Sequence, residues 1–224
     1  MSITKKKKII FKDKICYVFD FDGVIKDSVS IKTRAFVKIY ENQGKTFSNK
    51  VKEYHLKNGG MPRSKKFKFF EETLLNKKPT EDKINNLCER FSFIVKSEVV
   101  NSKPIPGVIK YLDNLNLTKK LKVINSATPF NELNDIITKC NFDKYFNKIY
   151  GSPSSKIENL LSIKDDFNLD LKQIIFFGDA ESDLLAAREL NIAFVGVGNF
   201  LKNINTNLNQ SNKYLFINDF NELI

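Results

Sequence analysis

The sequence predicts an α/β protein: a doubly wound parallel sheet with a small helical domain inserted after the first strand. Three observations support this fold class. Short apolar segments recur along the chain, and each is followed by small or polar residues. Segments with a helical spacing of apolar residues lie between them, and one long stretch, residues 26–103, contains no convincing strand. An alternation of strands and helices favours a sheet that helices cover on both faces.

The predicted strands are nearly continuous apolar runs rather than alternating ones. This pattern is typical of strands that are buried on both faces of a parallel sheet. The runs are residues 15–19, 121–124, 174–177 and 192–195, and a further strand ends at residues 149–150. Two helices of the sheet-bearing part are predicted at 108–115 and 182–190, where apolar residues recur at helical spacing.

The stretch 26–103 reads as amphipathic helices at residues 29–40, 65–75 and 81–99. Pro104 and Pro106 then interrupt the chain before the next predicted helix. A helical insert directly after the first strand is expected to lie over the strand ends. We therefore predict a core domain formed by residues 1–25 and 104–224, and a cap domain formed by residues 26–103.

The chain is strongly basic, with 37 Lys and Arg against 26 Asp and Glu and a net charge of +11. This balance favours anionic ligands in general, whether phosphate esters, nucleic acid or a membrane surface. The lysine run at residues 5–8 is expected to be a solvated tail. No apolar run approaches the roughly 20 residues that a membrane-spanning helix needs, so no membrane partner is expected.

The cysteines are few and scattered. Cys16, Cys88 and Cys140 lack the spacing of metal ligands, and an odd, sparse number fits a reducing cytoplasm. The chain has a single histidine, His55, which gives little support for a zinc site or for an activated cysteine nucleophile.

Polar and charged residues follow several of the predicted strands. Asp20 and Asp22 follow the first strand, Ser126 follows the second, and Asp179 and Asp183 follow a later one. The functional crevice of an open α/β sheet lies beyond the carboxyl ends of its strands, so these side chains should converge. A lysine, Lys156, comes just after the strand that ends at 149–150 and can face the same crevice.

Carboxylates gathered in one site repel each other, and a hard divalent cation with oxygen ligands resolves the repulsion. Magnesium binds readily through a few carboxylates together with phosphate oxygens. One carboxylate can then attack phosphorus, while the carboxylate two residues further on gives a proton to the leaving oxygen and later activates water. Ser126 and Lys156 supply a hydroxyl donor and a positive charge to the transferring phosphoryl group.

Four segments resemble, in order and spacing, the signatures of the haloacid dehalogenase superfamily of phosphatases. They are Asp20-Phe-Asp-Gly-Val-Ile, Ser126 after Lys122-Val-Ile-Asn, Lys156, and Gly178-Asp-Ala-Glu-Ser-Asp183. The resemblance implies a Rossmann-like core, with Asp20 as the nucleophile and Asp22 as the general acid and base. It also implies Mg²⁺ held by the Asp20 carboxylate, the Asp22 backbone carbonyl and the Asp179 carboxylate.

Some of these roles have rivals. Thr128 is the alternative to Ser126 as the hydroxyl donor. The alternative for Lys156 is that it is an ordinary surface lysine. Asp183 is expected to support the site, either near the metal or by holding Lys156.

In the predicted cap, residues 54–63 form a patch around a double glycine. Gly60 allows a close backbone approach to a ligand, and Arg63 offers a bidentate fork for phosphate or carboxylate. His55, and Lys32 on the first cap helix, are further candidates for contact with substrate, although packed or surface positions are equally ordinary for such residues.

The predicted function is a Mg²⁺-dependent phosphatase that hydrolyses a small phosphomonoester, such as a sugar phosphate, through an aspartyl-phosphate. A carboxylate at Asp22 favours ester chemistry, because the dehalogenase and phosphonate-cleaving branches of the superfamily lack it. A phosphomutase of the β-phosphoglucomutase type, which shares this core, is the alternative within the superfamily. A catalytically silent, basic nucleic-acid-binding protein on the same fold is the alternative from another class, and the complete set of acidic residues and Lys156 weighs against it.

Overall fold

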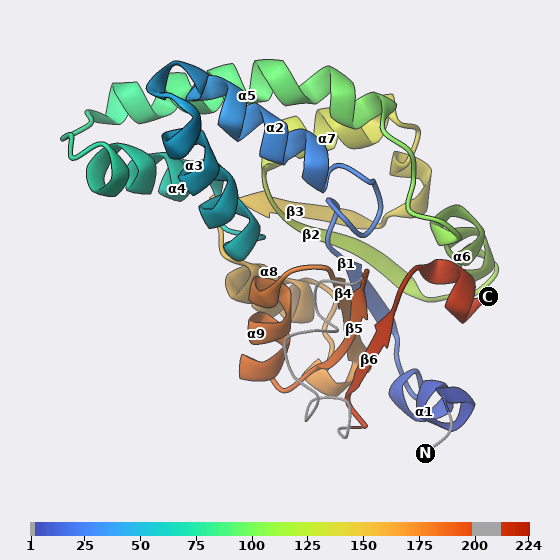
Figure 1. Cartoon of the computed structure of the whole chain (residues 1–224). Helices are drawn as coiled ribbons and strands as arrows, with labels where there is room; N and C mark the ends of the chain where they lie inside the picture. The colour runs from blue at the N-terminus through green and yellow to red at the C-terminus, as the bar shows by residue number, and fades with distance from the viewer. Residues whose placement is uncertain (1–2, 199–211) are drawn as a thin grey trace.

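The computed structural model describes residues 3–198 and 212–224. Within them, a six-stranded parallel sheet has the order β3-β2-β1-β4-β5-β6 (Figure 1). The strands are β1 (Cys16–Phe19), β2 (Leu121–Pro129), β3 (Lys148–Ser152), β4 (Ile174–Gly178), β5 (Ala193–Val197) and β6 (Tyr214–Ile217). The predicted doubly wound parallel sheet is confirmed, and β6 is a strand that the sequence pattern did not predict.

Helices cover both faces of the sheet. Those that flank it are α6 (Val108–Asn116), α7 (Phe130–Lys139), α8 (Lys156–Asp166) and α9 (Glu181–Glu189). Successive residues of β1 point to opposite faces: Phe19 packs in the apolar cluster of α6 and α7, whereas Val18 packs in that of α8 and α9. This double coverage explains why the strands are continuous apolar runs rather than alternating ones.

Between β1 and β2 the described chain is helical. The segments are α2 (Val29–Ile39), α3 (Lys45–Lys57), α4 (Arg63–Phe69), a π-helical turn at Phe70–Leu74, and α5 (Glu81–Asn101). The predicted helices at 29–40, 65–75 and 81–99 correspond to α2, to α4 with its π-helical turn, and to α5, whereas α3 was not predicted. We call residues 29–101 the helical insert; its limits as a separate domain stay a prediction.

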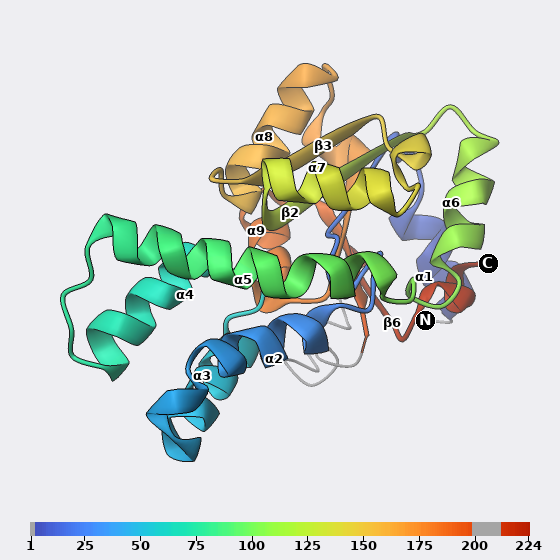
Figure 2. The same ribbon diagram turned by 90° about the horizontal axis from the view of Figure 1, so that it is seen from above.

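The helical insert lies to one side of the sheet in both views (Figures 1 and 2). Aromatic side chains fill its interior, with ring centroids 4.3 Å apart for Phe36 and Phe91 and 5.1 Å apart for Phe36 and Phe67. Helix α5 begins where the Thr80 side chain accepts a hydrogen bond from the Lys83 backbone N–H, and Glu81 and Asp82 follow in its first turn.

The expectation of a solvated N-terminal tail is wrong. Helix α1 (Ile3–Ile10) contains the lysine run, Ile10 is buried, and the Lys7 ammonium donates to the backbone carbonyl of Glu222. The remaining elements are short 3-10 turns at Glu41–Gln43, Asp143–Tyr145, Leu171–Gln173 and Phe220–Leu223. Among the described residues, no helix combines the length and the apolar character needed to cross a bilayer.

Candidate active site

The side chains predicted to converge do lie together beyond the carboxyl ends of the central strands. Asp20 directly follows β1, Asp179 directly follows β4, and Ser126 lies near the end of β2. Lys156 is the first residue of α8, which a capping box at Ser155 and Glu158 fixes in place. The sheet order puts β2 and β4 on either side of β1, and this arrangement brings the three strand ends into one site.

Asp20 and Lys156 are buried and form an ion pair. The Lys156 ammonium lies 2.6 Å from Asp20 Oδ2, and the backbone N–H of Phe21 donates to Asp20 Oδ1 at 2.7 Å. Lys156 also forms an ion pair with Asp183, whose side chain is fully buried. Burial by itself would lower the pKa of Lys156, but the charges of Asp183 and Asp20 outweigh it and raise the pKa above its ordinary value. The lysine is therefore a fixed positive charge.

Three carboxylates converge around this lysine. One oxygen from each of Asp20, Asp179 and Asp183 lies within 4.8 Å of the others. Burial and the charges of Asp20 and Asp183 raise the pKa of Asp179 well above its usual range. Burial also raises the pKa of Asp183, to about 6. One ammonium does not balance three carboxylates in a buried site, so a divalent cation with oxygen ligands fits this group.

Asp22 lies at the centre of a second network. Its Oδ1 accepts a hydrogen bond of 2.6 Å from the Ser28 hydroxyl, and its Oδ2 forms an ion pair with Lys32 and accepts from Thr128 Oγ1 at 3.2 Å. Lys32 also donates to Thr128 Oγ1 at 2.8 Å. Burial would raise the pKa of Asp22, but the Lys32 charge and the three hydrogen bonds overcome it and lower the pKa. Asp22 is therefore ionised in this arrangement.

Ser126 and Thr128, which the sequence left as alternatives for the hydroxyl donor, make different contacts in the structure. Ser126 is buried and lines the cavity, and the one hydrogen bond that its hydroxyl makes within the described part of the chain is from the Thr128 backbone N–H at 3.3 Å. The Thr128 hydroxyl is engaged with Asp22 and Lys32. Ser126 is thus the hydroxyl that is left to donate to a ligand, and that role stays a prediction.

Two glycines let the chain pass close to acidic and polar groups of the core. Gly23 has a φ of +76°, and a Cβ there would clash with the carboxylate of Asp179. Gly60 has a φ of +73°, and a Cβ there would clash with the hydroxyl of Ser182, which donates to the carbonyl of Gly59 at 2.9 Å. The double glycine therefore lets the backbone of the helical insert contact α9, so the group that this backbone approaches closely belongs to the core.

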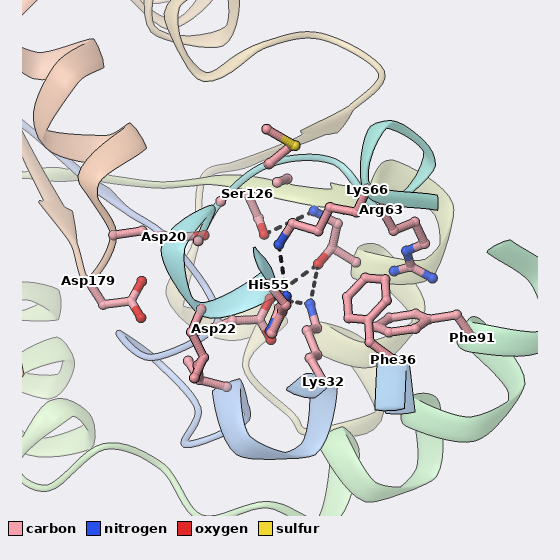
Figure 3. A pocket seen from close by; sticks show the side chains of 18 residues that line it. Asp20, Asp22, Lys32, Phe36, His55, Arg63, Lys66, Phe91, Ser126 and Asp179 are labelled. Carbon is pink, nitrogen blue, oxygen red and sulfur yellow. Dashed lines mark hydrogen bonds and ion pairs between the residues drawn. The ribbon is translucent and has the colours of Figure 1, made fainter. Parts of the chain in front are cut away.

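A cavity of about 250 Å³ joins the acidic residues to the helical insert (Figure 3). All four candidate substrate contacts line it, and they are Lys32, His55, Gly60 and Arg63. The Arg63 guanidinium is already engaged, because it makes a bidentate pair with Glu132 at 2.6 and 2.8 Å and donates to Ser92 at 2.6 Å. Contact of these four residues with substrate stays a prediction.

Sequence reasoning missed two residues of this region. Lys66 is buried in the cavity wall, where its ammonium lies 2.9 Å from His55 Nδ1, and Glu132 holds Arg63. Helical phase provides a signal for Lys66, because Arg63, Lys66, Phe67 and Phe70 lie at i, i+3, i+4 and i+7 and are all buried. Nothing in the sequence marks Glu132, whose partner lies 69 residues away.

Comparison with known proteins defines the class of this protein. Residues 17–197 match the family described as haloacid dehalogenase-like hydrolase. The match spans most of the chain, so the chain belongs to that family of hydrolases.

Individual relatives are distant. A phosphoglycolate phosphatase of Haemophilus influenzae is 24% identical over 151 residues, which cover 65% of this chain and 67% of the relative. A phosphorylated carbohydrates phosphatase of Thermotoga maritima is 24% identical over 186 residues, which cover 78% of this chain and 81% of the relative.

A solved β-phosphoglucomutase from Clostridium difficile shares the fold with a TM-score of 0.74 at 23% identity, over 94% of this chain and 93% of that one. A structure described as a predicted phosphoglycolate phosphatase from Haemophilus somnus gives a TM-score of 0.73 at 22% identity, over 95% and 97%. At such identities these two structures establish the fold alone.

Proposed function

We propose that this chain is a phosphatase that hydrolyses a small phosphomonoester, such as a sugar phosphate or similar metabolite, through a phosphoaspartyl intermediate on Asp20. The observation that carries the proposal is the contact between Asp20 and Lys156 beside two further carboxylates. The family membership and the names of the two curated relatives support the same reaction class.

In the first step a carboxylate oxygen of Asp20 forms a bond to phosphorus as the bond from phosphorus to the ester oxygen breaks. Asp22 gives its proton to that leaving oxygen, so the departing group is an alcohol. Asp22 is ionised without substrate, and the negative charge of an adjacent phosphoryl group raises its pKa and favours the protonated form that this step needs.

In the second step a water molecule attacks phosphorus and the bond to Asp20 breaks. Asp22, now ionised, takes the proton of the water, which returns both carboxyl groups to their starting forms. Ser126 donates to a phosphoryl oxygen, and Lys156 neutralises the charge that passes between Asp20 and the phosphoryl group.

The acidic residues fit a bound Mg²⁺. Asp20 and Asp179 would hold it through their carboxylates, with the backbone carbonyl of Asp22, while Asp183 is occupied by Lys156. The ion, when bound, supplies positive charge that lets a carboxylate and a phosphate dianion approach each other.

The cavity supports a substrate of metabolite size. Its volume of about 250 Å³ suits a small molecule, and the helical insert encloses it on the side opposite the strands. The three cysteines are free thiols, which fits our proposal that the protein works in a reducing cytoplasm.

A direct test uses p-nitrophenyl phosphate with and without Mg²⁺. We expect turnover that a chelator abolishes and that Asp20→Asn reduces by about four orders of magnitude or more, because the nucleophile is lost. Product analysis with phosphorylated sugars separates the phosphatase, which releases inorganic phosphate, from the phosphomutase alternative, which returns an isomeric ester. Absence of turnover with all esters, together with salt-sensitive retention of nucleic acid, would support the binding protein instead.

A further inference from the structure

A buried lysine of the helical insert forms no ion pair with any residue that the structure describes. Lys66 lies on α4 with only 3% of its surface exposed, and it lines the same cavity as Asp20 and Asp22. Figure 3 shows its ammonium directed at His55, in the part of the cavity that also holds Lys32 and Asp22. Among the described residues, the ammonium forms a hydrogen bond with His55 Nδ1 at 2.9 Å and lies over the ring of Phe36, whose centroid is 5.5 Å away.

The other long cationic side chains of the cavity are paired. Lys32 forms an ion pair with Asp22, and Arg63 forms one with Glu132. No ion pair among residues 3–198 and 212–224 includes Lys66. The carboxylates that act on it from a distance are those of Asp22 and Asp179, which already face Lys32 and the acidic group around Asp20.

Burial of a cation without an opposite charge destabilises a fold, so such a group either loses its proton or takes its counter-charge from a ligand. His55 accepts a hydrogen bond from the ammonium and orients it. Burial and the nearby Lys66 charge lower the pKa of His55 to about 3, so the imidazole is neutral and adds no repulsion of its own. The pair therefore presents a single ammonium group to the cavity, and an anionic ligand would stabilise its charged form.

We propose that Lys66 binds a second anionic group of the substrate, so that the substrate is a small phosphomonoester that also carries a carboxylate or a second phosphate. The proposal rests on the proposed phosphatase function, because it places the reacting phosphoryl group at Asp20 and the second anion at Lys66. His55 is a positioning residue in this arrangement.

The dimensions of the site limit the distance between the two anions. The cavity holds about 250 Å³, and the rings of Phe36 and Phe91 line it on the side of the helical insert. Both the reacting centre and Lys66 lie in its wall, so a short carbon skeleton joins the two acidic groups.

The test compares pairs of esters that differ only at the far end. Phosphates of short alcohols that carry a terminal carboxylate are compared with those of equal chain length that carry a terminal hydroxyl, by kcat/KM. A third series carries a second phosphate and identifies which anion is preferred. We expect wild-type protein to favour one anionic series over the hydroxyl series by about 30-fold or more, the range of a buried charge contact.

Variants assign that preference to Lys66. In Lys66→Met the ratio of kcat/KM for the anionic and hydroxyl esters is expected to fall toward one, and Lys66→Arg should retain a preference of more than about fivefold. Lys65→Met removes an exposed lysine of the same helix and should leave all the rates unchanged.

Three outcomes overturn the inference. Turnover of hydroxyl esters with no preference for either anionic series contradicts it and leaves the phosphatase function standing. Absence of turnover on every ester, p-nitrophenyl phosphate included, contradicts both. A wild-type preference that survives unchanged in Lys66→Met also contradicts the assignment, and the wild-type comparison needs no variant to fold.

Discussion

The pair of Arg63 and Glu132 predicts a large loss of stability if one partner is removed. The guanidinium of Arg63 on α4 meets the carboxylate of Glu132 on α7 in bidentate geometry, and the two side chains are only 7% and 9% exposed. In Arg63→Met the Glu132 carboxylate stays buried with a single donor, the Ser92 hydroxyl. An uncompensated buried charge of this kind costs about 3–5 kcal/mol.

A loss of that size corresponds to a fall in Tm of about 6–20 °C in a chain of this length, since 1 kcal/mol shifts Tm by about 2–4 °C. Thermal unfolding followed by circular dichroism measures it. Hydrogen bonds from Arg63 and Ser92 overcome the effect of burial and lower the pKa of Glu132. Its contribution to stability is therefore present above the unfolded pKa of about 4.3 and is lost as the pH falls through the folded value.

The control is an exposed pair in the same helical insert. Arg34 and Glu98 lie 2.8 Å apart with side chains 63% and 52% exposed, and Arg34→Met should cost less than about 1 kcal/mol. The double variant of Arg63→Met with Glu132→Gln should recover most of the loss. Equal stability of Arg63→Met and Arg34→Met would refute the reasoning. In that case an effect of Arg63 confined to KM would favour its role as a substrate contact.

Three further predictions follow from the same contacts. Burial and the Lys32 charge lower the pKa of Lys66 to about 7, so KM for the anionic esters should rise as the pH increases above 7, and Lys66→Arg should flatten that profile. The titratable and charged groups that face Lys66 are His55, Lys32, Asp22, Asp179 and Lys156. Gly60→Ala should destabilise the protein by about 1–3 kcal/mol more than Gly44→Ala, as measured by chemical denaturation. Both glycines have a positive φ, but of the two only a Cβ at Gly60 would clash, with the side chain of Ser182. Asp22→Asn should reduce kcat most for esters with poor leaving groups, and an equal loss for all leaving groups would argue against its role as the acid.

The sequence predicted the fold well because its strands are buried on both faces. Continuous apolar runs are typical of strands in a covered parallel sheet, so the cores of β1, β2, β4 and β5 were found, although β2 continues to Pro129, beyond its predicted end at residue 124. Strand β6 was missed because its residues alternate between buried and partly buried positions at the sheet edge. Helix α1 was missed because its lysines dominate the composition, while the one residue that anchors it, Ile10, looks ordinary in the sequence.

The acidic residues could be predicted because strand ends meet at one edge of the sheet, whatever the rest of the structure does. Contacts across the helical insert could not be predicted from the sequence. The pairing of Arg63 with Glu132 depends on how α4 packs against α7, and the guanidinium predicted to contact substrate is also paired within the protein. The spacing of Lys66 from Phe67 and Phe70 places it on the buried face of α4, but the sequence does not show that this face lines the cavity.

The most direct test of the account is a crystal structure with Mg²⁺ and beryllium trifluoride, a mimic of a phosphoryl group bound to a carboxylate. We predict that the mimic is attached to Asp20, that the ion lies between Asp20 and Asp179, and that Lys156 keeps its contact with Asp20. A mimic bound elsewhere, or an ion held without Asp20 and Asp179, would contradict the central claim.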